Sequence, residues 1–407
     1  MNAVTLDEAI RCGDISLGRG NIISSKDIAT YPGDYPIYSS SAKGSGEFGR
    51  YGHFMFNEEL ITWSVDGGGR FFFRPKHKFS VTNVCGYMRV DQAKWNMQFV
   101  YYSLGFQHRR MTFDYQTKAH PSVVRHLYQL PSEPEPVQSK IAEILSTMDR
   151  AIEQTEALIA KQQRIKTGLM QDLLTRGIDE QGNLRSEETH QFKDSLLGRI
   201  PVEWDVRFLD SLAERGSGHT PNKLRPAYWN GGIKWVSLAD SRKLDDLYIS
   251  ETDKEISELG LKNSSAVLHP AGTVILSRDA GVGKSAILAH EMAVSQHFMA
   301  WRCKPKKLDN IYLYYWLQQD KPKFEGIASG STIVTIGLQF FREYSIAVPR
   351  EVTEQIAIST KLNDADAAIA QTQIFAHKLH CLKTALMQDL LTGKKRVTLL
   401  LEPAMTT

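Results

Sequence analysis

The sequence lacks the features that most quickly assign a protein to a class. Its four cysteines, Cys12, Cys85, Cys303 and Cys381, stand far apart, so no CxxC pair is available for a metal or redox centre, and reduced thiols are expected. No run of 18 apolar residues occurs, which predicts that the chain does not span a membrane. The N-terminal segment carries early acidic residues and lacks the apolar stretch of a signal peptide, so a cytoplasmic protein is expected.

Motifs of several enzyme classes are also missing. The chain contains no Pro-Pro, and therefore not the Asn/Asp-Pro-Pro-aromatic motif of amino-group methyltransferases. It contains no Pro-Asp, which argues against a PD-(D/E)xK nuclease core, and neither HExxH nor GxSxG. The twelve histidines are scattered, so no metal site is predicted. None of these catalytic motifs is therefore available to assign an enzyme class.

One glycine-rich segment, GVGKS (281–285), resembles part of a P-loop. A Walker A loop needs a first glycine five residues before the glycine of Gly-Lys, and that position holds Arg278. The following SAILA is typical of a strand and not of a helix whose N-terminus would bind phosphate. We predict a glycine-rich hairpin or loop. Two alternatives stay open, namely a nucleoside triphosphate site and contacts of Arg278 and Lys284 with a nucleic-acid phosphate.

Charge and length leave the class of protein open. The 49 Lys and Arg residues against 46 Asp and Glu give a net charge of +3, which neither requires nor excludes a nucleic-acid partner. The 407 residues predict two or three domains, at about 100–200 residues per domain.

The chain repeats itself over a long period. The segment LKTALMQDLLT (382–392) nearly copies IKTGLMQDLLT (165–175), with an offset of 217 residues, as from Lys166 to Lys383. The match extends upstream without gaps, so that Gln138–Thr175 aligns with Gln355–Thr392. The chain therefore consists of two halves that end in the same element.

That element is predicted to be a long helix. It contains no proline, and its apolar residues recur in three heptad columns, a stripe wider than a two-stranded seam. Each helix is therefore expected to pack on its twin and also on its own globular domain or another subunit. Proline-containing joints, LPSEPEPV (130–137) and AVPRE (347–351), precede the two helices.

The globular regions are predicted to be two copies of one α/β domain. Both contain many short runs rich in aromatic and β-branched residues, separated by Gly, Pro and Asn. In both, a strand, a Ser-x-Asp, a glycine-rich turn and a second strand follow one another, at 61–73 and 274–288. An aromatic helix follows in each copy, at 99–104 and 312–317.

Several loops have the composition of a DNA-binding surface. The segment 107–126 has four Lys or Arg residues and one acid, with aromatic residues between them, and RCKPKK (302–307) is a second basic cluster. The segments 38–46 and 215–229 are small, hydroxyl-rich and basic. Such residues suit phosphate contacts and the reading of base edges, although a solvated loop is the alternative for any one of them. The candidate DNA-binding residues are Ser39, Ser40, Lys43, Arg70, Arg109, Arg110, Lys118, His120, Thr220, Lys223, Lys234, Arg278, Lys284 and Lys306.

Together these features resemble the DNA-specificity (S) subunit of type I restriction–modification systems. The most specific parts are the duplicated LMQDLLT helix, the IPxxW segment formed by Ile200, Pro201 and Trp204, and SGxTP…Y..G.I.W, which runs from Ser217 to Trp235. The joint before the first helix departs from the family's Pro-x-x-x-Glu-Gln pattern, because Pro136 stands where the glutamine of the motif would be and Val137 precedes Gln138. The first domain has YPIYSSS in place of SGxTP, which predicts that the two domains read different sequences.

The resemblance implies a non-catalytic protein of mixed α/β (α+β) fold. Two similar target recognition domains would be joined by two long antiparallel coiled-coil helices with pseudo-twofold symmetry. The implied segments are target recognition domain 1 (1–137), helix 1 (138–176), a linker (177–199), target recognition domain 2 (200–351), helix 2 (352–392) and a frayed tail (393–407).

The resemblance also implies the partners. The chain would read a bipartite, asymmetric site in double-stranded DNA, with the helices setting the unread spacer. Two adenine-N6 methyltransferase (M) subunits would supply S-adenosylmethionine chemistry by base flipping, and restriction (R) subunits would supply translocation and cleavage that depend on ATP and Mg²⁺. No cofactor, metal or membrane is expected for this chain itself. The alternatives are a homologous subunit of another methyltransferase-based phage-defence system and a P-loop-like NTPase.

Overall fold

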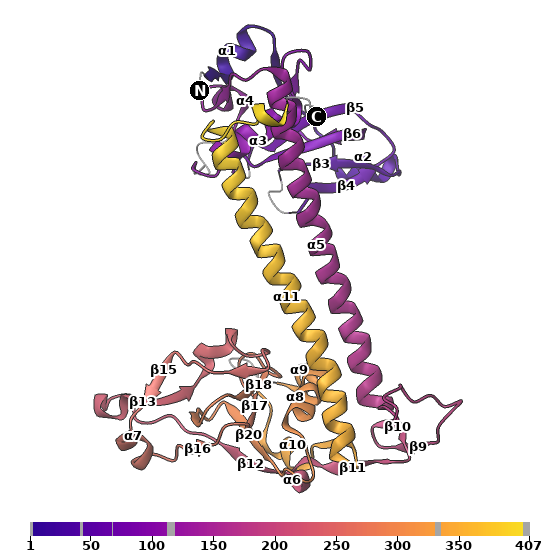
Figure 1. Cartoon of the computed structure of the whole chain (residues 1–407), viewed down its shortest axis with the longest axis vertical. Coiled ribbons are helices and arrows are strands. Elements are labelled where there is room, and N and C mark those ends of the chain that lie inside the picture. Colours follow the sequence, from indigo (N-terminus) through magenta and orange to yellow (C-terminus); the bar gives the residue numbers. More distant parts are fainter. Residues whose placement is uncertain (1–2, 41–43, 67, 112–118, 330–334, 402–407) are drawn as a thin grey trace, which may run out of the picture. The chain divides into compact units, whose positions relative to one another are not determined.

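The computed structural model describes residues 3–40, 44–66, 68–111, 119–329 and 335–401. The chain divides into two compact units, the first with Met1–Ala157 and Gln373–Thr407 and the second with Leu158–Thr372. Two long helices, α5 (Glu135–Arg176) and α11 (Val352–Leu391), each contribute to both units (Figure 1). Among the residues described, no helix combines the length and the apolar character that a membrane crossing requires.

The first unit is built on a six-stranded sheet. Its strands, in spatial order, are β2 (Ile15–Arg19), β7 (Cys85–Val90), β5 (Phe56–Ser64), β6 (Phe71–Val81), β3 (Tyr35–Tyr38) and β4 (Glu47–Tyr51). All neighbours are antiparallel except β3 and β6. A small sheet of β1 (Ala3–Thr5) and β8 (Gln129–Pro131) and four helices complete the domain: α1 (Leu6–Arg11), α2 (Ser25–Thr30), α3 (Met97–His108) and α4 (Pro121–Val124).

Strand β6 joins two runs that the sequence presents as separate strands. Pro75 lies inside this strand, where a proline would normally remove a ladder hydrogen bond. The pairing with β5 shifts between Glu58 and Leu60, opposite Pro75, so the proline falls on an irregularity of the ladder. One long strand therefore continues where the composition indicated a break.

The second unit repeats this topology. Its five-stranded sheet has the order β12 (Ala213–Ser217), β20 (Phe298–Cys303), β17 (Val274–Ser277), β18 (Ser285–Leu288) and β14 (Tyr248–Ile249). Strands β18 and β14 pair parallel, as β6 and β3 do in the first unit, and the other neighbours in this sheet are antiparallel. Strands β11 (Trp204–Phe208) and β21 (Ser345–Pro349) form a counterpart of the β1–β8 sheet. The prediction of two copies of one mixed α/β domain is confirmed.

The second unit also has elements of its own. A further four-stranded sheet consists of β15 (Lys254–Ile256), β13 (Trp229–Val236), β19 (Met292–Val294) and β16 (Leu268–His269). A hairpin of β9 (Phe192–Ser195) and β10 (Gly198–Pro201) crosses from the predicted linker into the predicted second domain. The short helices are α6 (Leu209–Leu212), η1 (Pro226–Tyr228), η2 (Leu238–Arg242), α7 (Glu258–Lys262), α8 (Asn310–Gln319), α9 (Lys321–Ile327) and α10 (Leu338–Glu343). The two domains therefore share a core and differ in what surrounds it.

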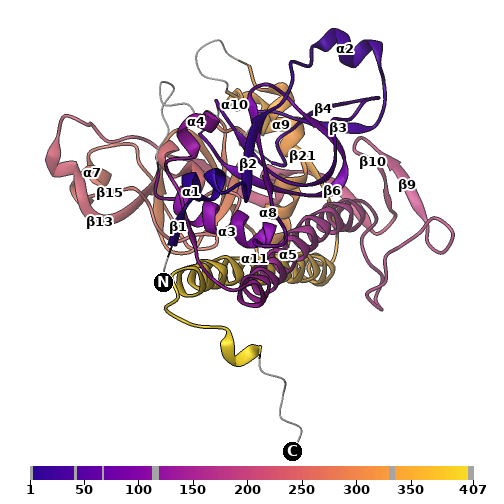
Figure 2. The ribbon, with the colours of Figure 1, turned by 90° about the horizontal axis from the view of Figure 1, so that it is seen from above.

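Within each unit the two long helices lie side by side and run in opposite directions (Figures 1 and 2). In the first unit, Leu145 near the start of α5 belongs to the same core as Leu390 near the end of α11. In the second unit, Leu173 near the end of α5 shares a core with Leu362 near the start of α11. Each core also contains the aromatic residues of its own domain, which confirms the expectation that each helix packs on both its twin and a globular domain.

The joint between each domain and its following helix is the same in both units. Gln138 is buried, and its Oε1 accepts a 2.8 Å hydrogen bond from the backbone N–H of Asn96 at the start of α3. Gln355, its equivalent in the repeat, accepts a 2.9 Å bond from the N–H of Asp309 at the start of α8. Both amide nitrogens donate to backbone carbonyls of the preceding joint. One buried glutamine thus fixes where each helix leaves its domain.

Two segment boundaries differ from the expectation. Helix α5 begins at Glu135, before the predicted boundary, because Pro136 is accommodated in the first helical turn, where no N–H donor is required. The tail was expected to be frayed, but that is wrong for its described residues: Val397 is 2% exposed in the core of the first unit and η3 (Thr398–Leu400) follows it.

Candidate nucleic-acid interface

The SGxTP segment of the second unit is fixed against the loop between β19 and β20. A side chain on Gly218 would place its Cβ 1.6 Å from the carbonyl oxygen of Val294, so only glycine permits this close approach. Two residues on, Thr220 Oγ1 donates a 2.6 Å hydrogen bond to Gln296 Oε1. A predicted DNA-binding residue is thereby joined to a side chain that is 76 positions away in sequence.

The polar contacts continue from this loop into the second unit. Gln296 Nε2 lies 3.4 Å from His297 Nε2, and the other ring nitrogen of His297 lies 2.7 Å from Asp279 Oδ2. Asp279 belongs to the Ser-x-Asp segment after β17 and also accepts a hydrogen bond from Thr335 Oγ1. Thr220, Gln296, His297 and Asp279 form a continuous chain, which we call the Thr220–Asp279 chain.

An open pocket of about 630 Å³ borders the Thr220–Asp279 chain. The residues that line it include Thr220, Lys223, Trp229, Trp235, Lys254 and Gln296. The rings of Trp229 and Trp235 meet edge to face, with centroids 5.2 Å apart. Ammonium groups, an amide and flat apolar walls beside one another suit phosphate contacts and base edges. The pocket brings together two predicted residues, Thr220 and Lys223.

The GVGKS segment is the turn of a hairpin. Strands β17 and β18 pair antiparallel on either side of it, so the segment precedes a strand and no helix N-terminus is available for a triphosphate. The prediction of a glycine-rich hairpin is confirmed. Lys284 Nζ donates to the carbonyl of Ser241 at 2.8 Å, and Arg278 Nε donates to that of Ile336 at 3.1 Å. Their contact with a phosphate stays a prediction.

In the first unit, the hydroxyl-rich loop after β3 is held at its start. Thr82 Oγ1 donates to Ser39 Oγ at 2.9 Å, and Ser64 Oγ donates to the carbonyl of Ser40 at 2.6 Å. These contacts attach Ser39 and Ser40 to the ends of β6 and β5. The predicted residues Lys43 and Lys118 lie outside the described residues.

Two arginines flank one ring on β6. The guanidinium carbons of Arg70 and Arg74 lie 5.0 Å and 4.7 Å from the centroid of the Phe72 ring. Arg74 is 6% exposed, stacks 3.5 Å from the centroid of Tyr38 and donates from Nε to Thr62 Oγ1 at 3.0 Å. Its burial lowers the pKa of the guanidinium. Arg74 forms no ion pair within the described part of the chain, and the Tyr38 ring and the Thr62 hydroxyl hold its buried guanidinium in place.

The charges of three arginines of the first unit act on one phenol. Burial and the charge of Asp149 raise the pKa of Tyr101, and the charges of Arg70, Arg109 and Arg74 oppose that shift. Arg70 and Arg109 are exposed, whereas Arg74 is buried. Two predicted residues of this unit therefore present positive charge to solvent, which a net charge of +3 does not reveal.

Other predicted residues have contacts within the protein. Arg110 Nη2 donates to Gln388 of α11 at 3.2 Å, and His120 caps α4 by accepting from the N–H of Ser122. Their contribution to DNA binding is untested.

The remaining two predicted residues lie in the second unit. Lys234 forms an ion pair with Glu251. Lys306 is exposed on the loop before α8. The carbonyl of the next residue, Lys307, accepts a hydrogen bond from Gln355. Lys306 does not line the pocket that contains Thr220. Neither placement tests its contact with DNA.

Sequence reasoning missed Arg74 and Gln296. Arg74 stands in an Arg-x-Phe-x-Arg pattern, and the period of two would have placed it on the face of Arg70. Gln296 has no local signal, because its partners Thr220 and Asp279 are distant in sequence.

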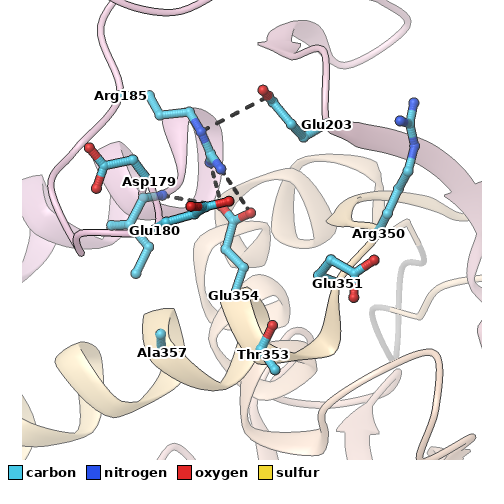
Figure 3. Close-up of a pocket in the computed structure, with 10 residues that line it drawn as sticks. Asp179, Glu180, Arg185, Glu203, Arg350, Glu351, Thr353, Glu354 and Ala357 are labelled. Atoms are coloured by element: carbon cyan, nitrogen blue, oxygen red, sulfur yellow. Dashed lines mark hydrogen bonds and ion pairs between the residues drawn. The ribbon is translucent and has the colours of Figure 1, made fainter.

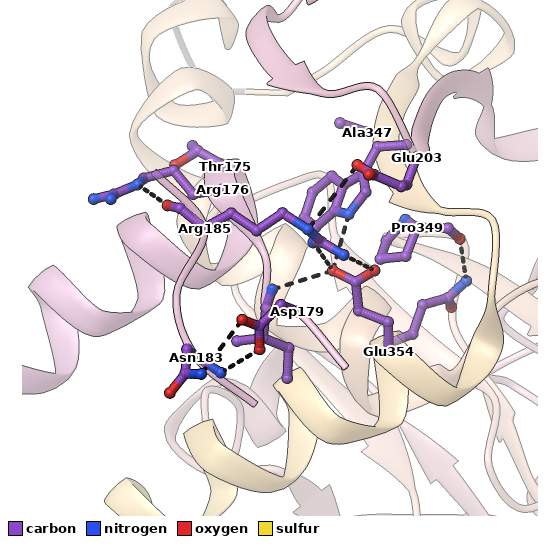
Figure 4. Close-up of polar contacts among 12 residues, drawn as sticks. Thr175, Arg176, Asp179, Asn183, Arg185, Glu203, Ala347, Pro349 and Glu354 are labelled. Carbon is purple, nitrogen blue, oxygen red and sulfur yellow. Dashed lines mark hydrogen bonds and ion pairs between the residues drawn. The ribbon is translucent and has the colours of Figure 1, made fainter. Parts of the chain in front are cut away.

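A second pocket, of about 470 Å³, lies where α5 ends in the second unit (Figure 3). Glu354 accepts hydrogen bonds there from Arg185 Nη2 at 3.1 Å and Trp204 Nε1 at 3.0 Å (Figure 4). Gly177, with φ +64°, sits so close that a Cβ would lie 2.4 Å from Glu354 Oε1. These contacts tie the linker and the IPxxW segment to α11. The group is a structural joint, since its charges are satisfied internally.

The chain matches a family model described as the type I restriction modification DNA specificity domain, over residues 8–162 and 201–376. A type I restriction enzyme MjaIX specificity subunit of Methanocaldococcus jannaschii is 30% identical over 182 residues, which are 44% of this chain and 41% of that protein. The MjaVIII specificity subunit of the same organism is 24% identical over 355 residues, 84% of this chain and 80% of that protein.

Two solved structures share the fold. The S subunit of a type I restriction–modification system from M. genitalium matches with a TM-score of 0.59 and 16% identity, over 100% of this chain and 96% of that one. A chain from a study of complex assembly and conformational transition of the type I R-M system matches with a TM-score of 0.57 and 16% identity, over 96% of this chain and 97% of that one.

Proposed function

Because the chain belongs to the family of type I restriction–modification DNA specificity subunits, we propose that its two domains read the two halves of a bipartite, asymmetric site in double-stranded DNA. The observation that carries this proposal is a shared sheet topology with different surroundings. The first domain offers the exposed Arg70 and Arg109, and the second offers the pocket beside Thr220 and Gln296. Two domains of one fold, related by a repeat, suit two half-sites, and their different loops suit different bases.

The two long helices connect the half-sites and provide the spacing. Within each unit the two helices pack antiparallel, and the domain of that unit packs on its own part of the helix pair. The distance between half-sites follows from helix length, as dimer geometry sets half-site spacing in other DNA-binding proteins. The unread spacer is therefore a property of α5 and α11.

The helices also carry a pair of equivalent apolar surfaces. Leu158 and Ile165 of α5 are 46% and 57% exposed, although they lie in the apolar heptad columns. Their repeat equivalents on α11, Phe375 and Leu382, are 55% and 49% exposed. We call these the two exposed apolar pairs. Large apolar side chains left exposed at the same two repeat positions indicate two copies of one partner.

The partners that fit this arrangement are two adenine-N6 methyltransferase subunits, with restriction subunits added for cleavage. S-adenosylmethionine, ATP and Mg²⁺ would be bound by those subunits. This chain would direct their reactions to one DNA sequence without taking part in the chemistry.

The test is reconstitution with the methyltransferase that the proposal expects to be encoded beside this gene. Methylation of random DNA should occur at one bipartite motif, should require this chain, and should weaken as salt rises, because phosphate contacts release counterions. Methylation without any sequence dependence would refute the proposal. Adding any neighbouring restriction subunit, with ATP and Mg²⁺, tests the cleavage function separately.

A further inference from the structure

The Thr220–Asp279 chain fixes the orientation of one exposed amide. Asp279 accepts from Thr335 and has no proton to give as a carboxylate, so the His297 Nδ1 that faces it at 2.7 Å must be the N–H donor. In the neutral imidazole, the other nitrogen, Nε2, is then an acceptor. This tautomer of a neutral ring matches the amide orientation in the structure, where Gln296 Nε2 faces His297 and Oε1 faces Thr220.

The same chain leaves part of that amide unused. Gln296 is exposed, and its oxygen receives one hydrogen bond, from Thr220 at 2.6 Å. Its nitrogen donates one, toward His297 at 3.4 Å. A glutamine amide has two N–H donors and two acceptor lone pairs, so one donor and one acceptor remain on this amide, which lines the pocket.

We propose that Gln296 reads an adenine of the half-site recognised by the second domain, and that Thr220 acts as the positioning residue for its amide. Adenine is the base that presents an acceptor, N7, beside a donor, the N6 amino group, in the major groove. The free N–H of Gln296 matches N7 and its free lone pair matches the N6 amino group. Guanine offers two acceptors in the same places, so it leaves the Gln296 oxygen without a donor. The inference rests on the proposed DNA-reading function and assigns one base contact within it.

The pocket supports this placement of the base edge. Lys223 and Lys254 line it along with Gln296, and ammonium groups close to a base-reading amide suit the flanking phosphates. A fixed amide also loses little conformational freedom on binding, which strengthens discrimination.

The experiment uses this chain in complex with its methyltransferase partners and a DNA library randomised across both half-sites. Gln296→Ala should lower the preference for adenine at one position of one half-site by about 5-fold to 150-fold, the range expected for a single bidentate base contact. The other half-site should keep its preferences. Thr220→Val, which keeps the shape and removes the hydroxyl donor, should lower the same preference less. Gln191→Ala, an exposed glutamine of the linker, is the matched control.

A chemical substitution in the DNA identifies the contact. Replacing that adenine with 7-deazaadenine removes N7, so the wild-type complex should lose affinity while the Gln296→Ala complex should lose little more. Unchanged preferences in both variants, a uniform loss over all sequences, or a preferred base other than adenine would each overturn the inference. If Gln296→Ala fails to fold, Thr220→Val and 7-deazaadenine still decide. If the wild-type complex shows no motif at all, the proposed function has failed instead.

Discussion

Asp149 of α5 forms an ion pair with Lys383 of α11 in the first unit. The same carboxylate accepts a 2.7 Å hydrogen bond from the hydroxyl of Tyr102 on α3, and Lys383 Nζ also lies 5.6 Å from the centroid of that ring. Three elements, the domain helix and the two long helices, therefore meet at one carboxylate. The contact fixes the register of α5 against α11 and the position of the domain on these two helices.

The repeat builds the same contact in the second unit. Asp366, the repeat equivalent of Asp149, pairs with Lys166 at 2.5 Å and accepts a 2.9 Å hydrogen bond from Tyr315 of α8. Lys166 and Lys383 are themselves repeat equivalents, so each helix gives its aspartate to one unit and its lysine to the other. Only an antiparallel pair in this register satisfies both units.

Neutralising either aspartate should weaken its own unit. In Asp149→Asn, Tyr102 keeps an acceptor but Lys383, whose side chain is 16% exposed, loses its partner. We expect the free energy of unfolding of the first unit to fall by about 1–2 kcal/mol, since the pair is only partly buried. Urea unfolding measures this, with exposed Glu153→Gln as the matched control. The double variant Asp149→Asn, Lys383→Met should lose less than the two single variants together, and simple additivity would show that the pair is not coupled.

Alkaline pH should destabilise both units through these phenols. Burial, together with the neighbouring aspartate, raises the pKa of Tyr102 and of Tyr315. Above the ordinary tyrosine pKa of about 10, the unfolded chain then releases protons that the folded chain keeps. Stability contributed by the neutral phenols is present below pH 10 and falls as pH rises beyond it.

The measurement is urea unfolding from pH 8 to 11. Tyr102→Phe should flatten the decline for the first unit and Tyr315→Phe for the second. The exposed Tyr248→Phe controls for the loss of one tyrosine. Equal declines in all four proteins would contradict the assignment.

Removing Glu354 should destabilise the second unit more than any surface change. The side chain of its partner Arg185 is 8% exposed, and Trp204 Nε1 and the N–H of Ile178 bind the same carboxylate. Glu354→Ala leaves the buried guanidinium with only the 4.0 Å contact to the half-exposed Glu203, and the loss of its close partner costs about 3 kcal/mol. The transition of the second unit in a denaturant titration should shift by that amount and that of the first unit should stay. The exposed neighbour Glu351→Ala should leave both transitions in place.

The long helices and the duplicated domain can be predicted from the sequence because each produces a regular pattern of residue types along the chain. The 217-residue repeat and the heptad columns set α5 and α11, and the duplicated joint residues Gln138 and Gln355 have the same role in both units. The prediction of a frayed tail was wrong because it was based on the polar composition of this stretch. The one buried apolar residue, Val397, packs against residues elsewhere in the first unit, and the local sequence does not show that contact.

The candidate interface is less predictable because it depends on contacts across long sequence distances. Thr220 can be predicted from its motif. Gln296 cannot, because its role depends on the fold of β19 and β20, which places it against Thr220 and places its neighbour His297 against Asp279. Lys234 and Lys284 are basic residues in suitable segments, yet their ammonium groups already bind Glu251 and the Ser241 carbonyl. Composition does not distinguish a charge used within the fold from one offered to DNA.

The two exposed apolar pairs should each bind one methyltransferase subunit. Phe375→Glu or Leu158→Glu alone places a charge on one surface, and we expect each to weaken one of the two binding events by about 2 kcal/mol or more. Native mass spectrometry should then show a complex with one methyltransferase subunit where the unchanged chain binds two, and the double variant should bind neither. Ile22→Glu, which alters a residue 79% exposed outside the helices, should keep both subunits. If the double variant still bound two subunits, binding would not depend on the two exposed apolar pairs. The methyltransferase contact would then lie elsewhere on the chain.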